Sequence, residues 1–302
     1  MKTIGIVAEY NPFHRGHAWH LEESRRLALA AGGDAAPAGC TPEEDTAVIA
    51  VMSGDFVQRG EAAVFSKYAR AEAACRCGAD LVVELPLPWS LSSAEGFARG
   101  AVTMLAALGA ELISFGSETA GQLPALETLA ALLADQAFTE EVRERLKRDP
   151  AQSFASARQS AAEARLGRPL PALRQPNNIL ALEYLKAIRE KQLPLTPLAV
   201  ARRGSGHDEA GESAYPSASE LRGRLRDGRE LAAGLPPEAE AVFRRERVAG
   251  RLAADPERQS LLMLSRLRGL RRRTFLLWRT PGTDSERDCI RRCGTGPVTT
   301  RS

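Results

Sequence analysis

Short apolar runs alternate with amphipathic stretches along the first part of the chain. The run over residues 3–8 is continuous and apolar, as expected of a parallel strand that is buried on both faces. Comparable runs predict strands at residues 47–52, 81–84 and 112–115. Helical patterns lie between them at residues 17–31, 66–77 and 94–108. This alternation predicts an α/β fold, a Rossmann-like domain with a mostly parallel sheet.

The pattern changes after Thr119. Stretches rich in Ala, Leu, Arg and Glu predict helices at residues 124–134, 140–147, 151–166 and 178–190, and a strand follows at 195–201. Residues 230–270 are helical in pattern again. We therefore expect a domain over residues 1–228, a helical C-terminal region over 229–280 and a disordered tail over 281–302. The Gly-, Ala- and Pro-rich residues 31–42 predict a flexible surface loop.

The strongest chemical signal is His14-Arg15-Gly16-His17, which follows the first predicted strand and opens the first predicted helix. Ligands of open parallel sheets bind at the carboxyl ends of the strands. A helix N-terminus there presents unpaired N–H groups and the positive end of the helix dipole to an anion. Gly16 lets a phosphate approach the backbone, and both imidazoles can donate hydrogen bonds to it. The motif predicts a site that stabilises charge on an α-phosphate as pyrophosphate leaves.

A simpler interpretation is that His14 and His17 are surface histidines at a helix start. However, the chain has four histidines, and three of them (His14, His17 and His20) fall at this one junction. That clustering favours the phosphate site. His20 lies one turn further along the helix, where we expect a neighbour of the site rather than a participant.

Composition narrows the class of protein without fixing its function. The 302 residues are 44% hydrophobic and 26% charged, as in a globular enzyme, and the net charge is +3. Arginines gather between residues 244 and 273, which fits either a surface for a phosphate backbone or a solvated helical face. The five cysteines lack zinc spacing, which indicates free thiols in a reducing compartment. No segment resembles a signal peptide or a membrane span, so a cytoplasmic protein is expected.

Further blocks of sequence accompany the His-Arg-Gly-His motif in a fixed order. They are residues 6–17 (Ile-Val-Ala-Glu-Tyr-Asn-Pro-Phe-His-Arg-Gly-His), 51–61 (Val-Met-Ser-Gly-Asp-Phe-Val-Gln-Arg-Gly-Glu), 66–67, 79–86, 115–118, 175–180, 202–208 and 217–222. Together they resemble the bacterial tRNA(Met) cytidine acetate ligase family, a branch of the HxGH nucleotidyltransferase superfamily. The resemblance covers roughly residues 1–225, and so many ordered blocks are more specific than HxGH alone.

The resemblance implies a nucleotidyltransferase domain that binds ATP and supports a two-step reaction. ATP and acetate give acetyl-adenylate and pyrophosphate. The acetyl group then passes to the exocyclic amine of the wobble cytidine in elongator tRNA(Met), giving N4-acetylcytidine. The implied partners are therefore acetate and elongator tRNA(Met), and Mg²⁺ is expected to accompany ATP.

The same resemblance implies the site residues. The catalytic residues are His14, His17 and Arg222. The ATP-binding residues are Val7, Ala8, Glu9, Tyr10, Asn11, Pro12, Phe13, His14, Arg15, Gly16, His17, Ala18, Trp19, His20, Gly116, Asn177, Asn178, Arg202, Ser217 and Ser219.

Local chemistry allows these roles and leaves alternatives open. Gly116 follows a predicted strand, where a Cβ would obstruct an adenosine. Asn177 and Asn178 start a helix, so one can cap it while the other bonds the nucleotide. Arg202 leaves a strand end and can either clamp a phosphate or remain a solvated loop residue.

The segment from Ser217 to Arg222 resembles the second nucleotide-binding signature of the superfamily, a Ser-rich turn that enters a helix. Its hydroxyl and N–H groups suit the β- and γ-phosphates, and Arg222 would neutralise the charge of the leaving group. Ser217 or Ser219 can also be a simple helix N-cap, which is compatible with phosphate binding.

Asp55, Gln58, Arg59 and Lys67 follow the second predicted strand on the same rim of the sheet. We regard them as candidates for the acyl-acceptor side. Ser53-Gly54 just before them also fits a simple turn.

Some features depart from the family pattern. Gly206 is followed directly by His207, without the intervening aromatic residue of the family, and residues 31–45 resemble an insertion. Relatives also continue beyond this length, so part of a basic, helical tRNA-binding surface is expected to be missing. Two other functions stay open: an HxGH adenylyltransferase acting on a small metabolite, and a non-catalytic RNA-binding relative. The oligomeric state is open as well.

Overall fold

The computed structural model describes residues 1–30, 41–58, 60–201, 215–253 and 255–269 of the chain. It divides into two compact units, Met1–Pro256 and Glu257–Ser302. Outside the described residues lie Arg59, Arg202, His207, residues 31–40 of the expected insertion at 31–45, and the tail at 281–302.

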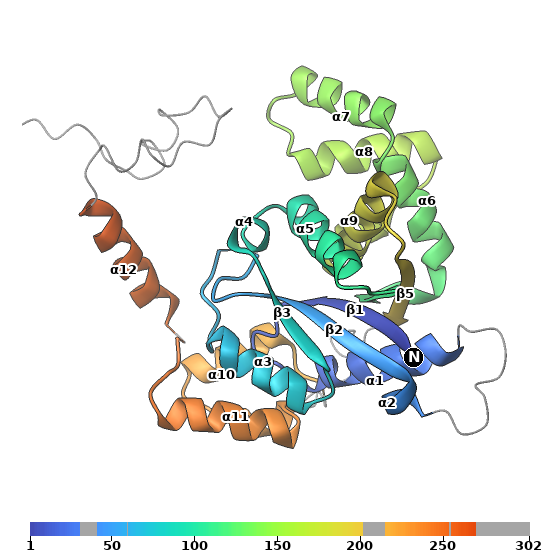
Figure 1. Ribbon diagram of the computed structural model, residues 1–302. Coiled ribbons are helices and arrows are strands. Elements are labelled where there is room, and N and C mark those ends of the chain that lie inside the picture. The colour runs from blue at the N-terminus through green and yellow to red at the C-terminus, as the bar shows by residue number, and fades with distance from the viewer. Residues whose placement is uncertain (31–40, 59, 202–214, 254, 270–302) are drawn as a thin grey trace, which may run out of the picture. The chain divides into compact units, whose positions relative to one another are not determined.

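The first unit is built on a five-stranded sheet in which every paired strand is parallel (Figure 1). Its strands are β1 (Lys2–Ala8), β2 (Thr46–Ser53), β3 (Leu81–Leu85), β4 (Leu112–Ser117) and β5 (Thr196–Ala201). The spatial order is β3-β2-β1-β4-β5, so the order reverses between β1 and β4. This is a doubly wound α/β sheet, and it confirms the predicted Rossmann-like fold.

Helices cover both faces of the sheet (Figure 1). One face packs against α1 (Arg15–Ala30), α3 (Lys67–Arg76), α10 (Ala218–Arg226) and α11 (Pro237–Val248). The apolar core on the other face is built with α5 (Ala94–Ala107), α6 (Leu123–Leu133), α7 (Gln136–Arg148), α8 (Phe154–Leu166) and α9 (Pro176–Lys191). Short elements join them: α2 (Pro42–Asp45), α4 (Leu87–Ser90) and the 3₁₀ turns η1 (Ala120–Gln122), η2 (Pro171–Arg174) and η3 (Ala232–Gly234).

The strand β1 divides its side chains between the two cores, as the alternation of side chains along a strand requires. Ile4 and Ile6 are buried in the core with α1 and α3, whereas Val7 packs against the core on the other face. Gly5 fits a close approach of α5, because a Cβ there would lie 2.7 Å from a methyl carbon of Leu105. The strand is thereby fixed on both sides, which gives the loop that follows it a rigid base.

The boundaries of several elements differ from the predicted ones. The first helix begins at Arg15, two residues before the expected start, because the carbonyl of His14 already accepts the backbone N–H groups of His17 and Ala18. The predicted end of the loop over residues 31–42 was wrong, because Pro42 already begins the short helix α2. The first turn of α2 is acidic, and Thr41 caps it. The expected cap Ser66 is confirmed, since its hydroxyl accepts a hydrogen bond from the backbone N–H of Ala69.

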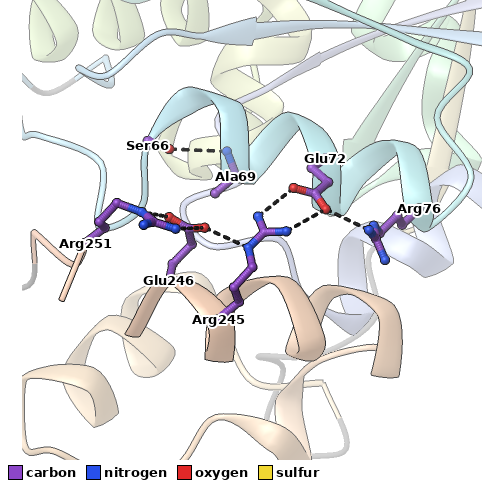
Figure 2. A network of polar contacts seen from close by, with 7 residues as sticks. All are labelled: Ser66, Ala69, Glu72, Arg76, Arg245, Glu246 and Arg251. Carbon is purple, nitrogen blue, oxygen red and sulfur yellow. Dashed lines mark hydrogen bonds and ion pairs between the residues drawn. The ribbon is translucent and has the colours of Figure 1, made fainter. Parts of the chain in front are cut away.

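A network of charged side chains joins α11 to α3 (Figure 2). The guanidinium of Arg245 donates two hydrogen bonds, of 3.1 and 2.7 Å, to the carboxylate of Glu72. The carboxylate of the buried Glu246 accepts hydrogen bonds from Arg245 and Arg251. Hydrogen bonds from Arg251 lower the pKa of Glu246 to about 2. The stacked rings of Phe65 and Phe243, with centroids 4.3 Å apart, add an apolar contact.

Because of these contacts, α11 is part of the first unit, which runs to Pro256. The division into a domain over 1–228 and a helical region from 229 stays a prediction. The described part of the second unit contains most of α12 (Pro256–Arg268), on which Leu261 and Leu262 are exposed.

None of the helices in the described part of the chain is both long enough and apolar enough to cross a bilayer. Cys75 and Cys77 are free thiols, as predicted. The other cysteines lie outside the described residues.

Candidate active site

A cavity of about 270 Å³ lies at the carboxyl ends of β1 and β4, where the strand order reverses. Its wall comes from the loop after β1, the first turns of α1, the ends of β4 and β5, and the starts of α9 and α10. Segments far apart in the sequence therefore meet at the switch point, which is where open α/β sheets bind ligands.

Most of the predicted site residues lie together in the wall of this cavity. They are Val7, Ala8, Glu9, Tyr10, Asn11, His14, Gly16, His17, Trp19, His20, Gly116, Asn177, Ser217 and Arg222. The remaining described candidates lie outside the wall: Pro12, Phe13, Arg15, Ala18, Asn178 and Ser219.

The imidazoles of His14 and His17 form the centre of the site. Their rings stack with centroids 3.8 Å apart and an interplanar angle of 25°. Nδ1 of His14 accepts the backbone N–H of Gly16 at 3.0 Å, and Nδ1 of His17 accepts the backbone N–H of His14 at 3.2 Å. A ring whose Nδ1 accepts a hydrogen bond carries its hydrogen on Nε2 in the neutral form. Each imidazole can therefore donate from Nε2 to a phosphate oxygen without being protonated.

Buried aromatic residues hold the position of His17. Its ring contacts Tyr10 edge-on at 4.9 Å and Phe13 at 5.5 Å between centroids. Tyr10 and Phe13 are themselves buried and meet at 4.9 Å. Burial raises the pKa of the Tyr10 phenol above its ordinary value. Phe13 thus packs against the ring of His17 and does not line the cavity.

Two glycines serve the site in different ways. A Cβ on Gly16 would lie 2.9 Å from Cε1 of His14, so glycine lets the imidazole fold back over the backbone. Gly116 lines the cavity and faces open space, since a Cβ there would meet no atom within 4 Å. The surface above Gly116 therefore has room for a flat group such as a nucleoside base.

The start of α10 approaches the motif from the other side. Nη1 of Arg222 donates to the carbonyl of Asn11 at 2.9 Å, and Nη2 donates to the hydroxyl of Ser219 at 3.1 Å. Ser217 is the N-cap of α10, and its hydroxyl accepts the N–H of Glu220. The helix N-terminus and the guanidinium thus lie in one wall of the cavity with the two imidazoles.

The two neighbouring asparagines have separate places. Asn178 is buried, accepts a hydrogen bond from the hydroxyl of Ser117 at 2.6 Å and donates to Thr119 and Gln175. Asn177 lines the cavity, and its Nδ2 donates to Oε1 of Glu118 at 2.6 Å. Neither side chain caps α9; the carboxylate of Glu118 accepts the backbone N–H groups of both residues instead. The helix cap expected from one asparagine therefore comes from an acid at the end of β4.

His20 lines the cavity. Its Nε2 lies 3.0 Å from the hydroxyl of Ser114, which lies 2.6 Å from the hydroxyl of Ser24. Burial lowers the pKa of His20 to about 4. The ring is therefore a neutral polar group near pH 7.

An apolar part of the wall was not predicted. It consists of Phe97, Phe115, Leu180, Tyr184 and Val200. These residues come from α5, β4, α9 and β5. They belong to the hydrophobic pattern of their own elements, so only the three-dimensional arrangement reveals that they face the cavity.

Arg70 is a buried residue that sequence reasoning missed. Its side chain is fully buried, and its guanidinium donates to the carbonyls of Phe65, Glu9, Ser53 and Gly54. Burial lowers the pKa of Arg70 to about 10. The guanidinium thus joins the loops after β1 and β2. An arginine beside Ala69, Ala73 and Ala74 on the buried side of α3 was the available signal.

The candidates after β2 lie along the rim next to the cavity. Gln58 lines the cavity, and its backbone N–H donates to the carboxylate of Glu9. Asp55 accepts the backbone N–H of Lys67, and Nζ of Lys67 lies 2.6 Å from Oε2 of Glu84. Nζ of Lys67 also lies 5.5 Å from the ring centroid of Tyr68. We call Lys67, Tyr68 and Glu84 the rim cluster.

Metal binding by the protein alone has no support in the described part of the chain. There, no group of three or more His, Cys, Asp and Glu side chains is arranged to hold a metal ion. Mg²⁺ that arrives with a nucleotide needs no such group, because phosphates and water supply most of its ligands.

Comparison with known proteins matches residues 1–274 to the family described as HIGH Nucleotidyl Transferase. Proteins named tRNA(Met) cytidine acetate ligase are similar over most of the chain. The protein from Syntrophotalea carbinolica is 42% identical over 88% of this chain and 61% of its own length. The one from Syntrophomonas wolfei is 39% identical over 89% and 62%, and the one from Kosmotoga olearia is 34% identical over 97% and 68%.

A solved structure agrees with these similarities. The crystal structure of Thermotoga maritima TmcAL bound with alpha-thio ATP is similar with a TM-score of 0.71 and 33% identity, over 83% of this chain and 57% of that one. The chain spans about three fifths of the length of the first two relatives. It belongs to the HIGH nucleotidyl transferase family and, within it, to the tRNA(Met) cytidine acetate ligase family.

Proposed function

We propose that this chain is an ATP-dependent acetate ligase that acetylates the wobble cytidine of elongator tRNA(Met). One observation carries the proposal: His14, His17 and Arg222 converge on one cavity at the switch point of the sheet, in a chain whose relatives have that name. The reaction needs cytoplasmic substrates, and we propose that compartment for the protein.

ATP is proposed to bind in the cavity with its base over Gly116 and its phosphates toward the start of α1. Glycine leaves the surface over residue 116 open, and the apolar wall suits a flat base. The N-termini of α1 and α10 both lie in the wall, and each favours an anion. Asn177 supports this placement as a polar group at the start of α9.

In the first step, an acetate oxygen attacks the α-phosphorus of ATP, and the bond to the β-phosphate breaks. The products are acetyl-adenylate and pyrophosphate. We propose that the Nε2–H groups of His14 and His17 stabilise the charge that builds on phosphate oxygens and that Arg222 neutralises the leaving group; the hydrogen bonds of both Nδ1 atoms to the backbone support this. No covalent enzyme intermediate is required. Mg²⁺ would enter with ATP and be held mainly by its phosphates.

In the second step, the exocyclic amine of cytidine attacks the acetyl carbonyl. N4-acetylcytidine, AMP and a proton result. We propose that the RNA reaches the cavity from the rim that carries Gln58, and that the basic helical region from residue 229 contributes to holding the RNA. The domain division at residues 228 and 229 and the further predicted ATP contacts, Arg202 among them, belong to this proposal.

The test is the complete reaction with the full chain. Purified protein is incubated with ATP, Mg²⁺, acetate and elongator tRNA(Met), and the RNA is digested to nucleosides and analysed by mass spectrometry. Acetylcytidine that depends on both ATP and acetate is the expected product. Pyrophosphate release with another small substrate, and none with acetate, would support a metabolite adenylyltransferase instead. RNA binding without any pyrophosphate release would support the non-catalytic alternative.

A further inference from the structure

The rim cluster presents an exposed aromatic ring on the rim of the sheet, outside the wall of the cavity. Tyr68 is 77% exposed although it lies in the first turn of α3. Its neighbours Lys67 and Glu84 form an ion pair with Nζ 2.6 Å from Oε2. The structure gives Tyr68 no role in either apolar core. Its exposed ring face is therefore available to a binding partner.

Side-chain hydrogen bonds to the backbone connect the rim cluster to the wall of the cavity. Asp55 accepts the backbone N–H of Lys67 at 2.9 Å. One helical turn later, Arg70 donates to the carbonyl of Glu9, a residue of the cavity wall. Gln58, in the loop between β2 and α3, lines the cavity as well. A group that rests on Tyr68 thus lies on the same rim of the sheet as the opening at Gln58.

The charges of the rim cluster fit a nucleobase better than a phosphate. Lys67 is paired with Glu84, so the two side chains together add no net positive charge. They place a donor and an acceptor side by side next to an aromatic face. Nucleobases carry donors and acceptors along their edges, and their faces stack on aromatic side chains.

We propose that Tyr68 is the stacking platform for a nucleobase of the RNA strand at the entrance to the cavity, with Lys67 and Glu84 contacting the edge of that base. The inference rests on the proposed function, because it takes the RNA substrate from there. It adds a binding residue for the second step only. Formation of acetyl-adenylate requires no RNA and does not involve Tyr68.

The chain provides a matched control for this inference. Phe154 in α8 is also an exposed aromatic residue, at 58%, and the guanidinium carbon of Arg158 lies 5.8 Å from its ring centroid. Phe154 does not line the cavity. Tyr68→Ala removes the ring, Tyr68→Phe retains it, and Phe154→Ala removes an equivalent ring elsewhere.

The experiment measures binding and chemistry separately with the full chain. Binding is followed by fluorescence anisotropy of a fluorescein-labelled anticodon stem-loop of elongator tRNA(Met). We expect Tyr68→Ala to raise the Kd about 10-fold, as for the loss of one stacked base, and Tyr68→Phe and Phe154→Ala to stay within about twofold. The 10-fold ratio should persist as salt is raised, because stacking does not release counterions from phosphates. Acetate-dependent ATP–pyrophosphate exchange should be unchanged in all three variants.

The two proposals can fail independently. An unchanged Kd in Tyr68→Ala, or no binding of the stem-loop by the wild type, overturns the stacking role. A wild type that binds the stem-loop through Tyr68 but forms no acetyl-adenylate overturns the proposed function and leaves the stacking role standing. An equal loss in Phe154→Ala also overturns the inference, because the effect would then not be specific to the rim.

Discussion

Two parts of the same sheet rim differ in how they hold polar groups. Between β1 and β4, His14 is 8% exposed, and both imidazoles of the motif use Nδ1 to accept backbone N–H groups. Near the ends of β2 and β3, the side chains of Lys67 and Glu84 are more exposed, and they form an ion pair with each other. The enclosed part directs donors into a cavity, which suits charge stabilisation. The open part offers a surface, which suits contact with a large substrate.

Loss of Arg70 should have the largest effect, because its guanidinium joins the two parts of the rim. Arg70→Met leaves four backbone carbonyls without their donor, and we expect a loss of about 3 kcal/mol or more in the free energy of unfolding. Urea denaturation followed by circular dichroism measures it. Arg76→Met on the same helix removes one exposed ion pair and should cost less than about 1 kcal/mol. Equal losses in the two variants would contradict this account of Arg70.

In the enclosed part, we expect Asn178 to contribute to stability and Asn177 to contribute to ATP binding. Asn178→Ala removes the ties to Ser117, Thr119 and Gln175 and should destabilise the protein by about 1–3 kcal/mol. Asn177→Ala removes one exposed hydrogen bond to Glu118, so it should change stability little, and it should raise the KM for ATP several-fold because Asn177 lines the cavity. Melting temperature and pyrophosphate exchange, measured on both variants, check the pair. A lower melting temperature in Asn177→Ala, together with a raised KM for ATP in a stable Asn178→Ala, would contradict these two roles.

The smallest effect is expected for Glu246, in the charged network that joins α11 to α3. The pKa of Glu246 is about 2, below its usual 4.5, so its ionised form favours the folded state. This contribution is fully present above pH 4.5 and is lost as the pH falls toward 2. Glu246→Gln should therefore lower the melting temperature by a few degrees at pH 7, and the difference should shrink between pH 4.5 and 2. A difference that is independent of pH would rule out the carboxylate as its source.

Much of the fold and part of the site could be predicted from local sequence. Continuous apolar runs identified the strands, and Ser66 and Ser217 act as the helix caps that their positions suggested. The His-Arg-Gly-His motif pointed to the cavity because a glycine and two imidazoles at a strand–helix junction are a local signal.

The remainder depended on contacts between distant residues. The cap of α9 comes from Glu118, 60 residues before Asn178, and nothing near the asparagines indicates it. Arg70 contradicts the rule that arginines stay at the surface, and its burial is possible only because four carbonyls from three segments meet around it. The apolar wall was hidden because Phe97 and Tyr184 fit ordinary core patterns.

We propose that the cavity between β1 and β4 activates acetate with ATP. The most direct test is acetate-dependent ATP–pyrophosphate exchange without tRNA, comparing the wild type with His14→Ala and His17→Ala. We expect exchange by the wild type and a loss of about 100- to 1,000-fold in each variant, as for removal of one donor to a developing charge. Circular dichroism should show that both variants remain folded. Exchange that proceeds equally well without either imidazole would contradict it.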